Sequence, residues 1–269
     1  MNQRNLYFNS IALFLRNCLA FLLVGLCLEV TGQSTPYTYT TANAHSHNDY
    51  EQPHPFWNAW QQQFGSIEAD IFLNNDRLIV AHDRKEMALR RTLDSMYLQP
   101  LQQCIKQNSG YPYADKKRML QLMIDIKTEA EPTLQKLVEV LKKYPSLIHS
   151  SSIIITISGN RPVPESYSRY PKWIWFDGDI GKTYNQRALA KIPMLSANFA
   201  NFVKWNGTDS LSAADKEKIQ HLISEVHHQG KKIRFWNAPD LPNSWRVFIN
   251  LGVDYINTDH IDELSGFLK

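Results

Sequence analysis

Two histidines of the sequence stand where acid–base chemistry could be done. The stretch AHSHNDY, which starts at residue 44, holds His45 and His47 two positions apart, and the apolar run LIVAHD closes on His82. Imidazole gains and loses a proton near neutral pH, so two histidines on either side of a substrate can serve as base and acid. We predict that His45 and His82 form this catalytic pair.

Two segments that read as hydrophobic strands carry charged residues on one face. In SIEADIFL the alternation places Glu68 and Asp70 opposite the apolar residues, and LMIDIKT places Asp125 and Lys127 together in the same way. Neighbouring carboxylates on an inward face repel each other and are costly to desolvate unless each gains a proton or a cation. We therefore predict that Glu68, Asp70 and Asp125 are the ligands of one divalent cation.

The type of ligand indicates the type of ion. Three carboxylates without a cysteine favour a hard cation, Mg2+ or Ca2+, over Zn2+, and the same oxygens serve either of the two. One dication, a lysine and two imidazoles suit an anionic substrate that gains charge in its transition state, as a phosphoester does. Lys127 is accordingly predicted to contact the substrate.

Four further residues are predicted substrate contacts, and each has a structural alternative. The segment KIRFWNA places Trp236 beside Arg234 at a strand end, and SGNRP places Arg161 after a strand. Trp236 could instead belong to the core, and Arg161 could be a solvated loop charge. His47 shares a side with His45 and contacts substrate or braces its loop, while Asn48 binds substrate or the metal, or stabilises a turn.

The elements that must position these residues alternate along the chain. Strands are predicted near 41–46, 66–73, 77–81, 120–127, 152–158, 173–177, 194–199, 232–237 and 254–258. Helical periodicity fills many of the gaps, for example Leu134, Leu137, Val138 and Leu141 at i, i+3, i+4 and i+7. A further helix is predicted from Ser212 to Gly230. This alternation predicts a mostly parallel sheet, best a (β/α)8 TIM barrel, with a doubly wound open sheet as the alternative.

The first 33 residues differ from the rest in composition. Arg4 and Arg16 precede an apolar run from Leu19 to Leu28, and small and polar residues follow. This layout is typical of a secretory signal peptide, and the run is too short to span a bilayer. We predict a signal peptide over 1–33, one domain over 34–269, and an exported protein, periplasmic or secreted, that keeps no membrane span after cleavage.

Overall charge and composition exclude some other classes. The chain has 269 residues, 43% of them hydrophobic, and a formal net charge of +3 without a basic run, so no nucleic-acid partner is expected. Its three cysteines form no disulfide framework or thiolate cluster.

Five motifs in order, HSHNDY, EAD, TLDSMYLQPL, IDIKT and RFWNAP, carry a family resemblance. The chain resembles the superfamily of glycerophosphodiester phosphodiesterases and phosphatidylinositol phospholipase C-like enzymes, and within it the poorly characterised altered-inheritance-of-mitochondria type. The resemblance implies a TIM barrel, a divalent ion at Glu68, Asp70 and Asp125, and acid–base chemistry by His45 and His82. Ser46 and His47 depart from the Arg and Gly of the glycerophosphodiesterase pattern, which puts glycerophosphodiesters in doubt as substrates but not the reaction type.

These observations together predict a metal-dependent phosphoric diester hydrolase that acts on a small-molecule or lipid-headgroup phosphodiester. Attack on phosphorus would come from a neighbouring substrate hydroxyl or from water. Two alternatives remain open, a phosphomonoesterase and a non-catalytic ligand-binding barrel.

Overall fold

The structure is a computed structural model that describes residues 38–89 and 91–269. The segment Tyr39–Lys269 forms one compact unit. The predicted signal peptide, 1–33, lies outside the described residues. Within the described ranges, no helix combines the length and the apolar character needed to cross a membrane.

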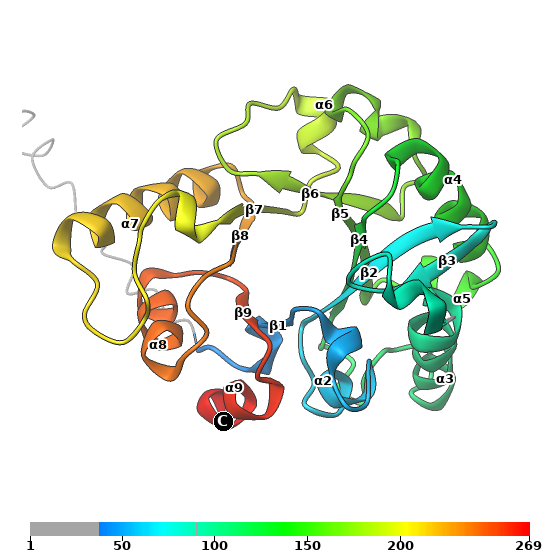
Figure 1. Ribbon diagram of the computed structural model, residues 1–269, viewed down its shortest axis with the longest axis horizontal. Coiled ribbons are helices and arrows are strands. Elements are labelled where there is room, and N and C mark those ends of the chain that lie inside the picture. The colour runs from blue at the N-terminus through cyan, green and yellow to red at the C-terminus, as the bar shows by residue number, and fades with distance from the viewer. Residues whose placement is uncertain (1–37, 90) are drawn as a thin grey trace, which may run out of the picture. The chain divides into compact units, whose positions relative to one another are not determined.

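Eight parallel strands form a nearly closed barrel, so the predicted TIM barrel is confirmed (Figure 1). The neighbours in the sheet run in the order β8-β7-β6-β5-β4-β2-β1-β9, and a bridge between Arg234 and Tyr255 links β8 to the start of β9. The strands are β1 (Ala44–Ser46), β2 (Ser66–Asn74), β4 (Leu120–Ile126), β5 (Ile153–Gly159), β6 (Ile174–Asp179), β7 (Met194–Asn198), β8 (Lys232–Trp236) and β9 (Ile256–Thr258).

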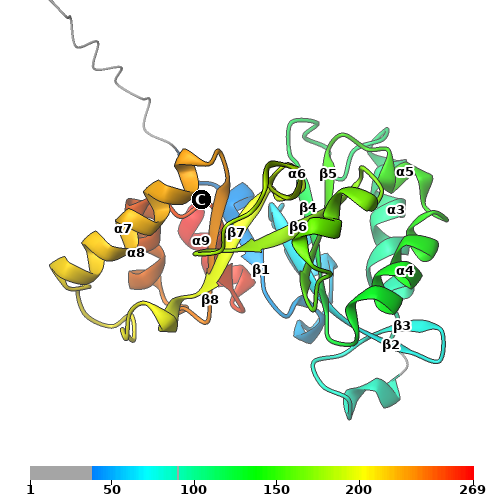
Figure 2. The same ribbon diagram turned by 90° about the horizontal axis from the view of Figure 1, so that it is seen from above.

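The remaining strand, β3 (Arg77–Val80), is not part of the barrel wall. It pairs antiparallel with the end of β2, with Ile71 opposite Val80 and Asn74 opposite Arg77. Asn75 and Asp76 form the turn with φ values of 46° and 59°, a left-handed conformation that these residue types tolerate and that matches the twist of a two-residue hairpin. The hairpin of β2 and β3 extends from one side of the barrel (Figure 2), and β3 ends two residues before His82.

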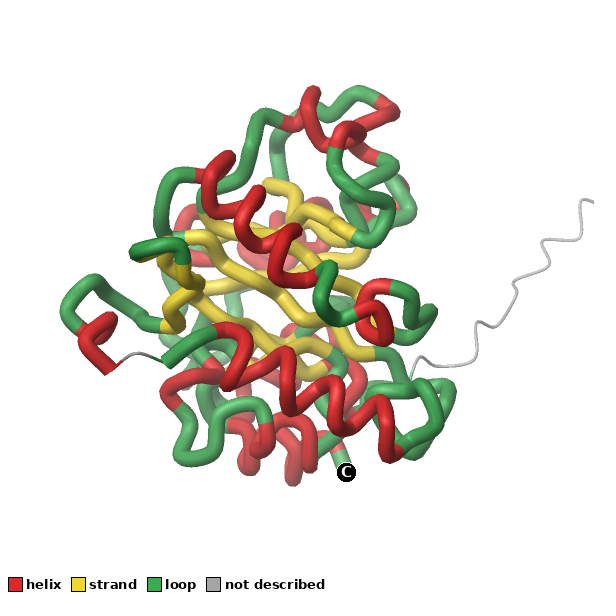
Figure 3. Tube along the Cα trace, turned by 90° about the vertical axis from the view of Figure 1, so that its right-hand side faces the viewer, coloured by secondary structure: helices red, strands yellow, loops and turns green. Residues whose placement is uncertain are grey.

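Helices surround the strands (Figure 3). The α-helices are α2 (Trp57–Gln61), α3 (Gln99–Gln107), α4 (Ala130–Leu141), α5 (Pro145–Ile148), α6 (Gln186–Leu189), α7 (Ala213–His228), α8 (Pro242–Leu251) and α9 (Ile261–Leu268). Shorter helical turns are η1 (Thr41–Asn43), η2 (Asp49–Glu51), η3 (Glu86–Leu89), η4 (Asp94–Leu98), η5 (Pro164–Arg169) and η6 (Phe199–Asn201). The two periodic patterns in the sequence correspond to α4 and α7.

The ends of α7 follow from its sequence. The hydroxyl of Ser212 accepts a hydrogen bond from the backbone N–H of Asp215, which satisfies one of the free donors of the first turn. Gly230, with a φ of 65°, follows the last turn, where a left-handed residue ends many helices. The predicted helix from Ser212 to Gly230 is therefore confirmed.

Strand alternation divides the side chains of β2 and β4 between two faces. Ile67, Ala69 and Ile71 are fully buried in the hydrophobic core, which leaves Glu68 and Asp70 on the other face. The register of β2 with β4 places Asp70 directly opposite Asp125. The fold thus brings carboxylates from two neighbouring strands to the same level of the barrel.

Candidate functional site

A cleft of about 510 Å3 lies among residues at or just beyond the carboxyl ends of the parallel strands, where TIM barrels place their active sites. Its lining includes eight of the residues predicted from the sequence: His47, Asn48, Glu68, His82, Asp125, Lys127, Arg161 and Trp236. The remaining two, His45 and Asp70, are fully buried and contact residues of the lining. The structure therefore brings all ten together.

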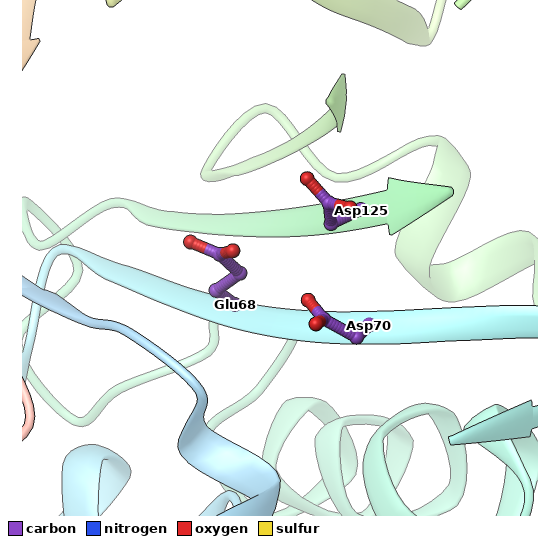
Figure 4. Close-up of side chains that lie close together, drawn as sticks. All are labelled: Glu68, Asp70 and Asp125. Atoms are coloured by element: carbon purple, nitrogen blue, oxygen red, sulfur yellow. The ribbon is translucent and has the colours of Figure 1, made fainter. Parts of the chain in front are cut away.

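The three acidic residues predicted as metal ligands form one cluster (Figure 4). Glu68, Asp70 and Asp125 each offer an oxygen, and these oxygens lie within 4.8 Å of one another. Burial, then the charges of Glu68 and Asp125, raise the pKa of Asp70 to about 7. Oδ1 of Asp70 is buried and has no hydrogen-bond donor among the described residues. Hard oxygen donors, crowded negative charge and a free buried oxygen fit a divalent cation.

Lys127 neutralises part of this cluster. Its Nζ lies 2.9 Å from Oδ2 of Asp70 and 2.9 Å from Oδ1 of Asp125. Burial acts to lower the pKa of Lys127, but the two carboxylates outweigh it and raise that pKa overall. The ammonium is about one-third exposed and lines the cleft, so it can also face an anion there.

Glu68 joins the acidic cluster to a buried basic group. Its Oε2 lies 2.7 Å from Nε2 of His45 and 2.8 Å from Nη1 of Arg234. Burial opposes ionisation of this carboxyl, but Arg234 and His45 hold its pKa well below the usual range. Glu68 is therefore ionised at neutral pH. Arg234 comes from β8 and is 4% exposed.

His45 is held at both ring nitrogens. Nδ1 lies 2.7 Å from Oγ of Ser66, which also accepts a hydrogen bond from Gln121. In one tautomer Ser66 donates to Nδ1 and His45 donates from Nε2 to Glu68; in the other, Nδ1 donates to Ser66 and Nε2 accepts from Nη1 of Arg234, 2.5 Å away. Burial, followed by the charge of Arg234, lowers the pKa of His45 to about 4, so the ring is neutral. The ring is beneath Glu68 and Arg234 rather than in the lining of the cleft.

His82 has the opposite environment. Its side chain is 54% exposed and lines the cleft. Its Nδ1 lies 3.0 Å from Oη of Tyr50 and 4.0 Å from Oδ2 of Asp70, so Nε2 is on the other edge of the ring. Glu86 accepts a hydrogen bond from the backbone N–H of His82 and helps to fix the loop after β3.

Of the other predicted substrate contacts, His47 and Asn48 have hydrogen-bond partners, and Trp236 is partly exposed. Nδ1 of His47 lies 2.8 Å from Oδ1 of Asp259. Asn48 adopts a left-handed conformation, with a φ of 44°, and accepts a hydrogen bond from Tyr50. Trp236 is 41% exposed, so it lies at the cleft surface and not in the core.

Arg161 forms hydrogen bonds to residues of β6 in the lining of the cleft. It donates to the backbone carbonyl of Asp177 and, at 2.7 Å, to Oδ1 of Asp179. Burial acts to lower the pKa of Arg161, but Asp177 and Asp179 raise it overall. The guanidinium is therefore a paired group of the wall and not a solvated loop charge.

Tyr50, Asp177 and Arg234 are functional candidates of the site that were not among the predicted site residues. A signal for Arg234 was present, because alternation in KIRFW places it on the same side as Trp236. Tyr50 lies within the HSHNDY motif, but its contact with Asp70 spans a separation of 20 residues that no local pattern indicates.

Comparisons with known proteins indicate similarity to phosphodiesterases. Residues 37–149 match the AIM6-like phosphodiesterase domain, and residues 232–262 match the glycerophosphoryl diester phosphodiesterase family. The chain is 25% identical to altered inheritance of mitochondria protein 6 homolog of Arthroderma benhamiae, over 83% of this chain and 82% of the relative. It is 26% identical to altered inheritance of mitochondria protein 6 of Kluyveromyces lactis, over 84% and 72%.

The fold also matches a solved structure. A glycerophosphodiester phosphodiesterase from Parabacteroides distasonis aligns with a TM-score of 0.52 at 16% identity, covering 84% of this chain and 96% of that one. The two family matches and the relatives, aligned over 82% and 72% of their own lengths, support a phosphodiesterase-like enzyme, and the solved structure supports the barrel fold. The matches support the glycerophosphodiester phosphodiesterase-like superfamily, with the AIM6-like branch within it, as the group that this chain resembles.

Proposed function

We propose that this protein is an exported, divalent-cation-dependent phosphoric diester hydrolase. The observation that carries the proposal is the cluster of Glu68, Asp70 and Asp125, whose oxygens lie within 4.8 Å of one another beside a cleft that His82 and Lys127 line. A cation held by closely spaced carboxylates, with a neighbouring imidazole, would suit attack on a phosphorus centre that is already negatively charged.

Glu68, Asp70 and Asp125 would hold the cation, either Mg2+ or Ca2+, which supplies charge stabilisation to the phosphoryl oxygens when bound. Lys127 then serves two roles. It limits the repulsion between Asp70 and Asp125, and its partly exposed ammonium offsets charge on the substrate. His47, Asn48, Arg161 and Trp236 are proposed to contact the rest of the substrate from the cleft lining.

The two histidines are proposed to move the protons. His82 faces the cleft and accepts the proton of the attacking hydroxyl or water at Nε2, because Nδ1 faces Tyr50. His45 is proposed as the proton donor to the leaving oxygen; because its ring is neutral in the resting site, it must first take up a proton from solvent, and Glu68 would stabilise the imidazolium so formed. Nε2 lies 2.7 Å from Oε2 of Glu68, so donation of a proton from Nε2 to substrate requires Nε2 to exchange that partner.

The proposed substrate is a small-molecule or lipid-headgroup phosphodiester outside the cytoplasm. Export rests on the pattern of the first 33 residues, with basic residues before a short apolar run. Sequencing the amino terminus of the protein recovered from the extracytoplasmic fraction tests it: cleavage near Gly32 is expected, and an intact amino terminus there would contradict it.

The activity test is a parallel assay of bis-p-nitrophenyl phosphate and p-nitrophenyl phosphate with Mg2+, Ca2+ or excess chelator. We expect diester cleavage that requires a cation and falls by about 10²–10⁴-fold in His82→Ala and in His45→Ala. His149→Ala, which changes an exposed histidine outside the cleft, is the matched control. Full activity in chelator would exclude the metal requirement.

The same assay separates the alternatives. Faster cleavage of the monoester would indicate a phosphomonoesterase, and cleavage of neither compound with any cation would indicate a non-catalytic ligand-binding barrel.

His45 has two candidate roles, proton donor to the leaving oxygen and positioning of Glu68. Cation affinity, measured by calorimetry, separates them. A variant with reduced cation affinity but normal turnover at saturating cation would show that His45 positions Glu68 and donates no proton.

A further inference from the structure

Among residues 38–89 and 91–269, the hydrogen-bond partners of Arg234 all lie at Nη1, on one side of its guanidinium group. Nη1 lies 2.8 Å from Oε2 of Glu68 and 3.2 Å from Oδ1 of Asn257. It also lies 2.5 Å from Nε2 of His45. The side chain is 5% exposed, yet it lines the cleft. These contacts all involve Nη1, which is one of the three guanidinium nitrogens.

The other edge of the guanidinium, formed by Nε and Nη2, has a different environment. Nε is buried and finds no acceptor in the part of the chain that the structure describes. Nη2 lies 3.8 Å from Oδ2 of Asp177, which is beyond hydrogen-bond distance. A buried donor without an acceptor is destabilising, and in a native protein it calls for an explanation.

The other two cationic side chains of the cleft lining are already paired. The ammonium of Lys127 lies 2.9 Å from each of two carboxylates. The guanidinium of Arg161 donates from both terminal nitrogens, to the carbonyl of Asp177 and the carboxylate of Asp179. Among these three cationic side chains of the lining, Arg234 is the one with a guanidinium edge, formed by Nε and Nη2, that remains available to a ligand.

We propose that Arg234 binds two oxygens of a phosphate group through Nε and Nη2. The planar fork of an arginine matches two oxygens of a tetrahedral oxyanion, which a lysine cannot do. Because Glu68 belongs to the acidic cluster and also contacts Arg234, this subsite and the predicted cation site lie in the same cleft. A role in turnover rests on the proposed function, whereas anion binding does not.

The competing explanation is that Arg234 acts only as a buried counter-ion. In that case its charge would hold Glu68 and Asp177 in place, and no ligand would contact Nε or Nη2. Asp177 is ordered by a hydrogen bond from Ser196 on the next strand, so this wall is stable without a ligand. The two explanations differ in what a charge-conserving substitution does to anion binding.

The test is calorimetric titration of the full chain with inorganic phosphate, with and without Mg2+, for the wild type and for Arg234→Lys. Lysine keeps the positive charge beside Glu68 but removes the fork, so we expect phosphate to bind about 10- to 100-fold more weakly. The control is Arg246→Lys, an exposed arginine on α8 that stacks on Phe267, which should leave phosphate affinity unchanged. Phosphate affinity of Arg234→Lys within twofold of the wild type, or a wild type that binds no phosphate, would overturn the proposal.

Two further measurements keep the result interpretable. If Arg234→Lys does not fold, a phosphate-soaked crystal of the wild type decides: phosphate oxygens next to Nε and Nη2 support the proposal, and phosphate bound elsewhere overturns it. Diester hydrolysis is measured on the same samples. Arg234-dependent phosphate binding without hydrolysis would refute the proposed function alone, and hydrolysis by Arg234→Lys with an unchanged KM would refute this inference alone.

Discussion

The phenol oxygen of Tyr50 lies 3.0 Å from Nδ1 of His82. The same oxygen lies 2.8 Å from Oδ2 of Asp70 and 2.9 Å from Oδ1 of Asn48, both of which are acceptors. Burial and then the charge of Asp70 raise the pKa of Tyr50, so its single proton stays in place and goes to one of these oxygens. Towards His82 the phenol can therefore only accept, and neutral His82 keeps its proton on Nδ1 and its lone pair on Nε2.

This arrangement makes Tyr50 a positioning residue for the proposed base. We expect Tyr50→Phe to lower kcat on bis-p-nitrophenyl phosphate by about 10- to 100-fold, because His82 loses the acceptor that fixes its tautomer. KM should change little, since the phenol does not line the cleft. Removal of a lysine or arginine that contacts the substrate would show the reverse, a changed KM with little change in kcat.

The control for Tyr50→Phe is Tyr113→Phe. Tyr113 is also buried and also donates a hydrogen bond, at 2.7 Å, but to the backbone carbonyl of Phe64 and away from the cleft. Both variants lose one buried hydrogen bond, so similar losses of stability are expected. Equal kcat values for the two variants would show that Tyr50 has no role beyond the fold.

A second prediction concerns Gly159, at the end of β5. Its φ is 68°, and a Cβ there would lie 2.5 Å from Oδ1 of Asp125 and 2.6 Å from the carbonyl oxygen of Ile126. Gly159→Ala must therefore displace the carboxylate of Asp125 or the backbone beside it. We expect weaker binding of the divalent cation, measured by calorimetry, together with a loss of stability of about 1–3 kcal/mol.

Gly230→Ala isolates the backbone strain from the effect on Asp125. Gly230 has a φ of 65°, but nothing lies within 4 Å of its Cβ position. This variant should lose about 1 kcal/mol of stability through left-handed strain alone and keep its cation affinity. If both variants bind the cation equally well, Asp125 is not a ligand or does not need its present position.

Much of this architecture is predictable from local patterns. Each strand expected from the sequence is present, with its ends shifted by a few residues, because hydrophobic alternation and flanking turns report on local structure. The acidic cluster is predictable for the same reason. Glu68 and Asp70 share a face by alternation, and in a barrel of sequential strands β4 is the next parallel strand, so Asp125 is their neighbour.

The rest depends on contacts across the barrel that no local pattern contains. The segment 77–81 was predicted as a strand, but β3 pairs antiparallel with β2 outside the barrel, and that hairpin decides where His82 lies. Arg234 reaches Glu68 over a separation of 166 residues and His45 over 189. Such partners follow from the register and closure of the whole sheet, so only the structure reveals that His45 is buried while His82 is exposed.

The third prediction concerns the pH dependence of stability and Asp49. This carboxylate has no exposed surface and accepts hydrogen bonds from the hydroxyls of Ser46 and Tyr97 and from the backbone N–H of Phe56. Burial raises its pKa from 3.8 to about 6 in spite of these bonds. Between about pH 4 and pH 6 the folded state therefore holds a proton that the unfolded state has lost.

The sign of the effect follows from this difference in bound protons. Asp49 should lower the free energy of unfolding as pH rises from about 4 to 6, by about 3 kcal/mol in total, with no further change above that range. In Asp49→Asn this contribution is absent, so its unfolding free energy, measured by urea denaturation at pH 4, 5, 6 and 7, should fall less steeply than that of the wild type. Glu217→Gln, which removes an exposed carboxylate on α7, should follow the wild-type slope. The same slope for Asp49→Asn and the wild type would mean that Asp49 titrates alike in the folded and unfolded states, and that its buried contacts compensate its charge in full.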